Sequence, residues 1–393
     1  MDASELRELL TPEALRLLDE LEPSAELGDA LTLVSRLRKQ GHPPSRVAAV
    51  LNQYRLRRKA ETKFGPFARR MLFTPTGLEQ ASRLRVAAVH AGRFAAPGLD
   101  RVADLGCGIG GDAMALAALE LRVTAVERDE VTAAIAAYNL VPFPNARVVH
   151  ADALEQPLDD VDAVWLDPAR REGASRLASP DDWSPSLTEA LAIANRLPAG
   201  IKLAPGMDRA LLPEGFEAQW ISVDGEVVEL VLWSGALARP GVGRAALVLR
   251  GTAPPAELRA ESDSVDVDSG PLGEYLYEPD GAVIRARLIG DLARSIGGRM
   301  LDPTIAYVTV DQLSPTPFAR GFRVLERFAI NVPTLKRALA ARGIGALEIK
   351  KRGVDIDPAQ LRPKLALRGS GSAVLLLTRI AGSRVALLAE RCD

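Results

Sequence analysis

Residues 102–112 read VADLGCGIGGD, and this stretch decides the fold of the chain. It lies between an apolar strand pattern and a helical pattern. Its glycines therefore predict a tight turn at which a ligand can approach the backbone without meeting a Cβ. Gly106, Gly108 and Gly111 also satisfy G-x-G-x-x-G, which is typical of dinucleotide sites. One such match is weak evidence, so the loop by itself leaves the nature of the cofactor open.

Short apolar runs alternate with helical patterns downstream of the loop. We expect strands at residues 101–105, 122–127, 146–150, 163–166 and 200–203. This alternation predicts a mostly parallel sheet with crossover helices. Two later runs, residues 226–233 and 245–250, are expected to form an antiparallel pair at the sheet edge.

Acidic residues follow the expected strands, where open α/β sheets bind their ligands. Glu127 can take both hydroxyls of a ribose, which NAD and S-adenosylmethionine (SAM) both contain. Asp104 directly precedes the glycine loop, where it would repel a pyrophosphate but hold a cationic amino group. Asp152 can accept a hydrogen bond from an adenine amino group, and Asp167 lies toward the reactive end of the cofactor. Asp104, Asp152 and Asp167 together favour SAM over NAD.

The ordered motifs in residues 99–250 resemble those of class I SAM-dependent methyltransferases. The likeness implies a Rossmann-like α/β fold with a seven-stranded sheet, and SAM as the cofactor. It implies that Asp104 and Gly106 hold the methionine portion, Glu127 the ribose and Asp152 the adenine end. The residues expected to bind the cofactor are Asp104, Gly106, Cys107, Gly108, Gly110, Asp112, Glu127, Arg128, Asp152, Ala153, Thr74 and Gln80.

The methyl acceptor is expected at Asp167, Pro168, Ala169 and Arg170, which we take as the catalytic residues. This D-P-A-R stretch resembles the D-P-P-Y motif of amino-directed nucleic-acid methyltransferases, with Arg170 in the place of the stacking aromatic. It also resembles the D-P-A-R of RNA uracil C5 methyltransferases, which need a cysteine nucleophile after the fifth strand. Residues 202–208, KLAPGMD, contain none, which favours methylation of nitrogen or oxygen.

Basic residues near this motif are candidates for binding the substrate. Arg170 and Arg171 either bind phosphate or stack on a base, or they form a salt-bridged loop with Glu172. Lys202 either neutralises an anionic substrate or is a strand-end lysine that extends its ammonium to water.

Residues 73–81, FTPTGLEQA, precede the expected catalytic domain. They resemble a segment that folds over SAM in cap-guanosine methyltransferases and their bacterial relatives, which makes Thr74, Glu79 and Gln80 candidates. The alternative is a helix start with Thr76 as the cap and Glu79 completing a capping box, and the two can hold together.

A strand pattern near the C-terminus ends in Lys350, Lys351 and Arg352, which we expect to bind substrate. This region resembles the end of a THUMP-like module, an RNA-binding appendage in related methyltransferases. The whole chain resembles a bacterial group that combines a helical N-terminal region, a D-P-A-R-R methyltransferase and a THUMP-like α+β domain. The expected segments are a helical domain at 1–93, a methyltransferase domain at 94–250, a linker at 251–270 and an α+β THUMP-like domain at 271–393.

The net charge of −2 conceals two basic blocks around an acidic centre. Residues 36–93 carry fourteen basic and two acidic side chains, and residues 319–393 carry fifteen and six. Clustered Lys and Arg suit a polyanion, but they can equally pair with acids of the same chain. The first block contains a cluster of seven basic residues: Arg55, Arg57, Arg58, Lys59, Lys63, Arg69 and Arg70.

The rest of the composition limits the class of protein. Two cysteines are too few for a disulfide framework and suit a reducing, cytoplasmic setting. We see no run of about 18 apolar residues and no signal-peptide pattern in residues 1–10, so no membrane association is expected. The three histidines lack ligand-like spacing, so no metal is expected. The oligomeric state is not readable from the sequence.

These patterns favour a SAM-dependent methyltransferase that acts on a nitrogen of a base in structured RNA, such as rRNA or tRNA. The low aromatic content, 5%, suits recognition by shape and phosphate better than by many stacked bases. The alternatives are a small-molecule or protein methyltransferase with structural basic blocks, and a non-catalytic RNA-binding protein that retains SAM.

Overall fold

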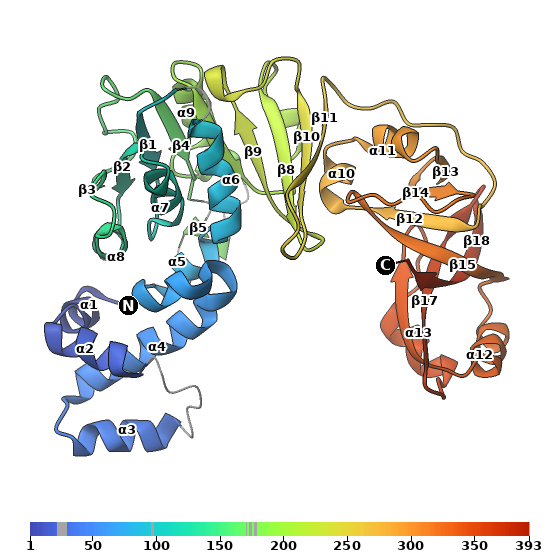
Figure 1. The fold of residues 1–393 in the computed structure, drawn as a ribbon, viewed down its shortest axis with the longest axis horizontal. Coiled ribbons are helices and arrows are strands. Elements are labelled where there is room, and N and C mark those ends of the chain that lie inside the picture. The colour runs from blue at the N-terminus through green and yellow to red at the C-terminus, as the bar shows by residue number, and fades with distance from the viewer. Residues whose placement is uncertain (22–29, 96–97, 170, 173–174, 177–178, 393) are drawn as a thin grey trace. The chain divides into compact units, whose positions relative to one another are not determined.

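A computed structural model describes residues 1–21, 30–95, 98–169, 171–172, 175–176 and 179–392. The chain divides into two compact units, residues 1–203 with 232–238, and residues 204–231 with 239–393. Figure 1 shows the elements of both units in chain order by colour. The segment boundaries expected at residues 93, 250 and 270 stay predictions.

The first unit begins with helices. They are α1 (Ala3–Leu9), α2 (Pro12–Leu21), α3 (Ala30–Lys39), α4 (Pro44–Phe64), the 3-10 helix η1 (Gly65–Arg70), α5 (Pro75–Gln80) and α6 (Leu84–Ala95). Thr11 caps α2, since its Oγ1 accepts a hydrogen bond from the Ala14 amide at 3.3 Å. Helix α4 is longer than its apolar pattern indicates, because no glycine or proline interrupts it before Gly65. The helix begins at Pro44, so Ser45 lies inside its first turn.

The expected parallel strands are present: β1 (Arg101–Leu105), β2 (Arg122–Glu127), β3 (Ala146–His150), β4 (Ala163–Leu166) and β7 (Ala199–Leu203). Strand β1 pairs in parallel with β2 and β4, β3 with β2, and β7 with β4. The crossover helices are α7 (Gly111–Ala118), α8 (Glu130–Leu140) and α9 (Leu187–Ala194). Helix α6 packs against the sheet, since the Trp165 ring of β4 contacts the rings of His90 and Phe94 of α6.

The sheet has nine strands rather than the expected seven, in the order β11-β10-β8-β9-β7-β4-β1-β2-β3. Strands β9 (Glu226–Trp233) and β10 (Arg244–Leu249) lie at the runs expected from the sequence, and the two additional strands are β8 (Glu217–Val223) and β11 (Ala256–Ala260). The expected antiparallel pairing of β9 with β10 is wrong, because β10 pairs in parallel with β8 and antiparallel with β11. The α/β fold class is confirmed.

The expected linker at residues 251–270 contains strand β11, which is a correction. The segment is poor in large apolar side chains, so its composition resembles that of a loop. An edge strand needs backbone pairing on one side only, and polar residues are usual there. The composition of residues 251–270 therefore does not predict β11, because this strand is stabilised by its pairing with β10.

The second unit also contains a seven-stranded sheet in the order β13-β14-β12-β15-β18-β17-β16. Its strands are β12 (Tyr275–Pro279), β13 (Arg299–Asp302), β14 (Ile305–Val310), β15 (Ala319–Ala329), β16 (Ile344–Lys351), β17 (Gly371–Ile380) and β18 (Ser383–Arg391). Its helices are α10 (Gly281–Arg285), α11 (Ile289–Ser295), α12 (Val332–Ala341) and α13 (Pro358–Leu365). The expected hairpin of β17 and β18 is present. Helices α10 and α11 are separate, because Arg287 between them takes a left-handed φ of 59°.

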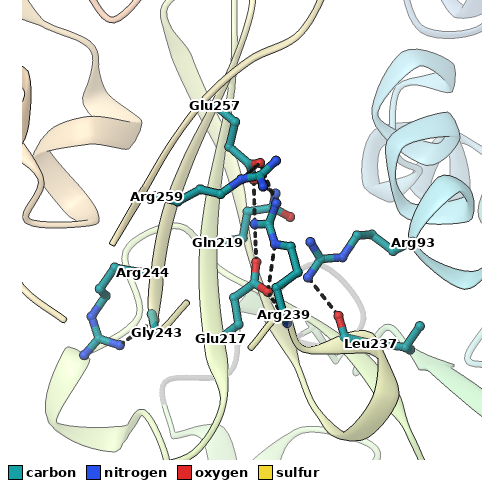
Figure 2. Close-up of polar contacts among 9 residues, drawn as sticks. All are labelled: Arg93, Glu217, Gln219, Leu237, Arg239, Gly243, Arg244, Glu257 and Arg259. Atoms are coloured by element: carbon teal, nitrogen blue, oxygen red, sulfur yellow. Dashed lines mark hydrogen bonds and ion pairs between the residues drawn. The ribbon is translucent and has the colours of Figure 1, made fainter. Parts of the chain in front are cut away.

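A buried ion network joins strands β8 and β11 of the second unit (Figure 2). Arg239 donates to both carboxylates, Glu217 and Glu257, with its Nη1 2.6 Å from Glu257 Oε2. The Glu217 side chain is fully buried. Burial would raise the pKa of Glu257, but the hydrogen bonds and positive charges of Arg239 and Arg259 together outweigh it and the pKa is lowered. The network therefore holds the polar edge of the sheet together.

Replacing Arg239 with alanine should lower the free energy of unfolding by about 3–5 kcal/mol, because Glu217 would remain buried without its counter-ion. Arg259→Ala is the matched control. Arg259 is half-exposed and also binds Glu257, so its loss should cost less than about 1 kcal/mol. Urea unfolding measures both. The folded pKa of Glu257 is lowered, so its contribution to the free energy of unfolding is complete above the ordinary value of 4.5. This contribution is lost as the pH falls from there through the folded pKa. Equal effects of the two variants would contradict this account.

Candidate active site

The glycine loop lies at the carboxyl end of β1 and is fixed to β2. The amides of Gly106 and Cys107 both donate to the Val126 carbonyl, at 3.0 Å each. Gly106 has a φ of +87°, and a Cβ there would lie 2.9 Å from the Asp167 carbonyl oxygen. Only glycine satisfies both conditions. The loop and the motif after β4, which are 60 residues apart in sequence, are thus in direct contact.

Asp104, directly before the loop, is fully buried. Neither of its carboxylate oxygens has a hydrogen-bond partner among the residues that the structure describes. Burial, followed by the charges of Asp112 and Asp167, raises its pKa well above the ordinary value. A buried, unpartnered carboxylate is costly unless something pairs with it. The cationic amino group of SAM would provide both the charge and the hydrogen bonds, so this residue fits the cofactor expected from the sequence.

The carboxylate of Glu127 is held in a fixed orientation at the end of β2. Its Oε2 accepts from the Gly108 amide at 3.0 Å, and its Oε1 accepts from the Asp129 amide at 2.9 Å. A carboxylate has about four acceptor positions, so capacity remains for ribose hydroxyls. The adjacent Arg128 is exposed and donates to Ser184 Oγ at 2.8 Å.

Asp152 lies just after β3, where the sequence predicts the adenine end. Its Oδ1 accepts from the Leu154 amide at 2.9 Å, which shapes a turn containing Ala153. Both residues are half-buried. Their expected contacts with adenine stay predictions.

Asp112, at the start of α7, binds two side chains that the sequence reading missed. Its Oδ2 accepts from Ser82 Oγ and its Oδ1 lies beside His90 Nδ1, both at 2.8 Å. Burial would raise the pKa of Asp112, but the interactions with His90, Lys202 and Ser82 together outweigh it and the pKa is lowered. Gly110 takes a left-handed φ of 86° and allows the chain to enter α7 at this point. Asp112 thus ties the start of α7 to α6 and the segment before it.

Burial raises the pKa of the Cys107 thiol well above its ordinary value, and the charges of Asp104 and Glu127 add to the effect. The thiol is therefore protonated at neutral pH. A thiolate, not a thiol, is the effective nucleophile. This agrees with the expectation that the chain does not use covalent catalysis through a cysteine in the cofactor loop.

Helix α5 packs closely against the glycine loop. A Cβ added at Gly77 would lie 2.5 Å from Ile109 Cγ2. Thr74 is the cap of α5, because its Oγ1 accepts from the Gly77 amide at 2.9 Å. The alternative cap, Thr76, is wrong, since it lies inside the helix. Glu79 and Gln80 are exposed at the end of α5.

Lys63, at the end of α4, secures the last turn of α5, and the sequence reading missed this role. Its Nζ donates to the carbonyls of Leu78, Glu79 and Ala81 at 2.7–2.8 Å. Burial, together with the nearby Lys202, lowers its pKa to about 8. A cation at the C-terminus of a helix also interacts favourably with the helix dipole. Lys63 is thus a positioning residue for the segment that covers the loop.

The variant Lys63→Met should loosen α5, because three carbonyls would lose a charged donor. We expect a loss of about 2 kcal/mol in the free energy of unfolding. Backbone amides of residues 78–81 should also exchange their hydrogens faster. Lys59→Met is the matched control, since Lys59 is exposed one turn earlier on the same helix. Unchanged exchange in residues 78–81 of Lys63→Met would show that Lys63 does not secure the helix.

Asp167 and Lys202 form an ion pair at the ends of the neighbouring strands β4 and β7. Lys202 Nζ lies 2.7 Å from Asp167 Oδ2 and 3.4 Å from the Gln80 carbonyl. The Lys202 side chain is only 5% exposed, so the alternative of an ammonium extended to water is wrong. Lys202 fixes the orientation of Asp167 and links it to the end of α5.

The residues after Asp167 are placed by pairing with residue 184. Pro168 is buried, and the Ala169 amide donates to the Ser184 carbonyl at 2.8 Å. Arg170 lies outside the described residues. Arg171 begins the short strand β5 (Arg171–Glu172), which pairs with β6 (Ser175–Arg176). The substrate contacts expected of both arginines stay predictions.

The basic residues at the end of β16 belong to the second unit. Lys350 Nζ lies 2.6 Å from Glu278 Oε2. The Arg352 guanidinium lies over the Tyr307 ring, 5.3 Å from its centroid, and 3.9 Å from Glu278. Lys351 is exposed. Two of the three residues thus have partners within their own unit, and their role in binding substrate stays a prediction.

None of the described helices is long and apolar enough to cross a lipid bilayer.

Comparison with known proteins shows which families parts of the chain match. Residues 319–391 match the family model described as THUMP domain-like, and residues 2–60 match one described as a domain of unknown function. A crystal structure of a putative methyltransferase from Porphyromonas gingivalis W83 covers all of both chains with a TM-score of 0.74 at 21% identity. This similarity shows the shared fold.

Two relatives from Mycobacterium tuberculosis, of strains CDC 1551 and H37Rv, are each named as an uncharacterized S-adenosylmethionine-dependent methyltransferase. Each is 37% identical over 347 residues, which is 86% of this chain and 94% of the relative. The fold and the buried acid before the glycine loop agree with these names. The chain belongs to the S-adenosylmethionine-dependent methyltransferases, and SAM is its cofactor.

Proposed function

We propose that this methyltransferase modifies a nitrogen of a base in structured RNA. The observation that carries the proposal is the Asp167 carboxylate, which Lys202 holds at 2.7 Å beside the cofactor loop. A fixed carboxylate at this position suits an acceptor that carries N–H donors. Asp104, on the neighbouring strand β1, supports placing the amino-acid end of SAM nearby.

When bound, SAM supplies an electrophilic methyl group. Asp167 would accept a hydrogen bond from the acceptor nitrogen, with an adjacent backbone carbonyl as a second acceptor. These contacts turn the nitrogen lone pair toward the methyl group, and such positioning provides much of the rate in a displacement reaction. Lys202 keeps the Asp167 carboxylate in place throughout. The nitrogen loses one proton in the overall reaction, and this proton would pass to the Asp167 carboxylate or to solvent.

Two further features support RNA as the substrate class. The chain carries a THUMP-like region at residues 319–391, and such modules are RNA-binding appendages in the methyltransferases that the chain resembles. It also carries two basic blocks, as phosphate-binding surfaces do. We expect a base extruded from its stack to bind against Pro168 and Ala169, next to Asp167.

The test uses purified protein and radiolabelled SAM on total RNA from cells that lack the gene, followed by nucleoside analysis. Label in a methylated nitrogen of one nucleoside is the expected result. Label in protein or in small molecules, with none in RNA, would replace the proposal with a different acceptor class. No label anywhere, from protein shown to bind SAM, would favour a non-catalytic role.

A further inference from the structure

We infer that Ser184, held by Arg128, is a positioning residue for the methyl acceptor, because it fixes the direction of the peptide group between Pro168 and Ala169. The inference rests on the proposed function, since it takes the Asp167 carboxylate and a neighbouring backbone carbonyl as the contacts of the acceptor.

Two backbone hydrogen bonds join Ser184 to the acceptor motif. The Ala169 amide donates to the Ser184 carbonyl at 2.8 Å, and the Ser184 amide donates to the Ala169 carbonyl at 3.2 Å. The two residues thus pair as residues of antiparallel strands do. Both polar groups of the Ala169 backbone are therefore fixed by Ser184, so the position of Ser184 determines the orientation of the motif.

This pairing indicates which carbonyl of the motif receives the acceptor. The Pro168 carbonyl and the Ala169 amide belong to one planar, trans peptide group, so they point in opposite directions. Since the amide points at Ser184, the Pro168 carbonyl points away from it. The Asp167 carbonyl faces the glycine loop, where a Cβ on Gly106 would lie 2.9 Å from its oxygen. We therefore take the Pro168 carbonyl as the second acceptor beside the Asp167 carboxylate.

Arg128 holds the side chain of Ser184 from a different strand. It directly follows β2, and its Nη1 donates to Ser184 Oγ at 2.8 Å. Strand β1 lies between β2 and β4 in the sheet. The hydrogen bond therefore spans the carboxyl end of β1, where the glycine loop begins, and links the end of β2 to the acceptor motif after β4.

Both sides of this hydrogen bond are anchored. The Arg128 carbonyl oxygen lies 3.1 Å from Nε2 of His150, the last residue of β3. Ser184 lies between the buried Trp183 and Ser186, whose side chain caps α9. A group whose own surroundings are fixed can hold a neighbouring group in one orientation. The contact between Arg128 and Ser184 can therefore position the peptide group that Ser184 binds.

The experiment compares Arg128→Met, Ser184→Ala and the double variant in the full chain. The matched control is Arg147→Met. Arg147 is also exposed and also donates to a hydroxyl, Thr124 Oγ1 at 3.1 Å, but it lies near the start of β3. Calorimetry measures SAM affinity, and single-turnover transfer to bulk transfer and ribosomal RNA from cells that lack the gene measures the rate. Hydrogen exchange measures the protection of the Ala169 amide.

We expect each single variant to transfer methyl about 3- to 10-fold more slowly, as the loss of one exposed hydrogen bond predicts. SAM affinity should stay within about twofold, and the Ala169 amide should exchange faster. Because the two side chains act through one contact, the double variant should be no slower than the slower single variant. Arg147→Met should leave the rate, the affinity and the exchange unchanged.

Two results would overturn the inference while the proposed function stands. The effects of Arg128→Met and Ser184→Ala on the rate could multiply in the double variant, or Arg128→Met alone could weaken SAM binding, which would place Arg128 in the cofactor site.

The exchange measurement needs no acceptor, so it separates the inference from the proposed function. If the unmodified protein does not methylate RNA but the Ala169 amide exchanges faster in both variants, the acceptor class is wrong and the positioning of the peptide group stands. If exchange is unchanged as well, both fail.

Discussion

Replacing Asp167 with asparagine is expected to reduce methyl transfer by about 100- to 10,000-fold while leaving SAM affinity within about threefold. The amide preserves the size of the side chain but removes the negative charge and one acceptor. A residue that positions the acceptor or takes part in proton transfer contributes an effect of this size. Because Asp167 contacts the loop through its backbone, the loop should keep its shape. Single-turnover transfer from radiolabelled SAM measures the rate, and calorimetry measures the affinity.

The control for this variant is Asp160→Asn, which removes the same charge from a side chain that is 95% exposed. It should retain the full rate. If Asp167→Asn kept more than about a tenth of the activity, the acceptor would have to bind elsewhere. If it lost SAM affinity instead, Asp167 would belong to the cofactor site rather than to the acceptor site.

Replacing Asp104 with asparagine is expected to change SAM binding and protein stability in opposite directions. Loss of the charged partner for the SAM amino group should weaken SAM binding about 10- to 100-fold, as expected for a hydrogen bond between charged groups. The ligand-free protein should become more stable by about 1–3 kcal/mol at pH 8, because a costly buried carboxylate is removed. A residue with a merely structural role would lose stability on replacement.

The pH dependence provides an independent check on Asp104. Its folded pKa is raised above the ordinary value of 3.8, so the folded state binds the proton more tightly than the unfolded state. The free energy of unfolding of the ligand-free protein should therefore decrease as pH rises above about 4 and toward the folded pKa. Asp104→Asn should lack this component, and Asp160→Asn should keep it. Urea unfolding at pH 5 and pH 8 measures the difference, and identical pH profiles for all three proteins would contradict the assignment.

Local patterns were sufficient for much of the architecture. The five parallel strands and the loop at 102–112 were predictable because each is a short run whose character depends on its own residues. Helices α12 and α13 were predictable for the same reason, since caps and prolines mark their starts. Strand β11 was not, because an edge strand is stabilised by its partner and not by its composition.

The amino-acid sequence by itself determined the α/β class, the glycine loop, the cofactor and the order of the acids at the strand ends. Those features are written in residues close together in the chain. The partners of the individual side chains became clear only in the folded molecule. Lys202 and Asp167 are 35 residues apart, and His90 and Asp112 are 22 apart. The same holds for Lys63 and Arg57, which belong to the basic cluster but are used inside the protein. Packing alone distinguishes them from the exposed arginines beside them, because burial and pairing depend on elements that meet only after folding.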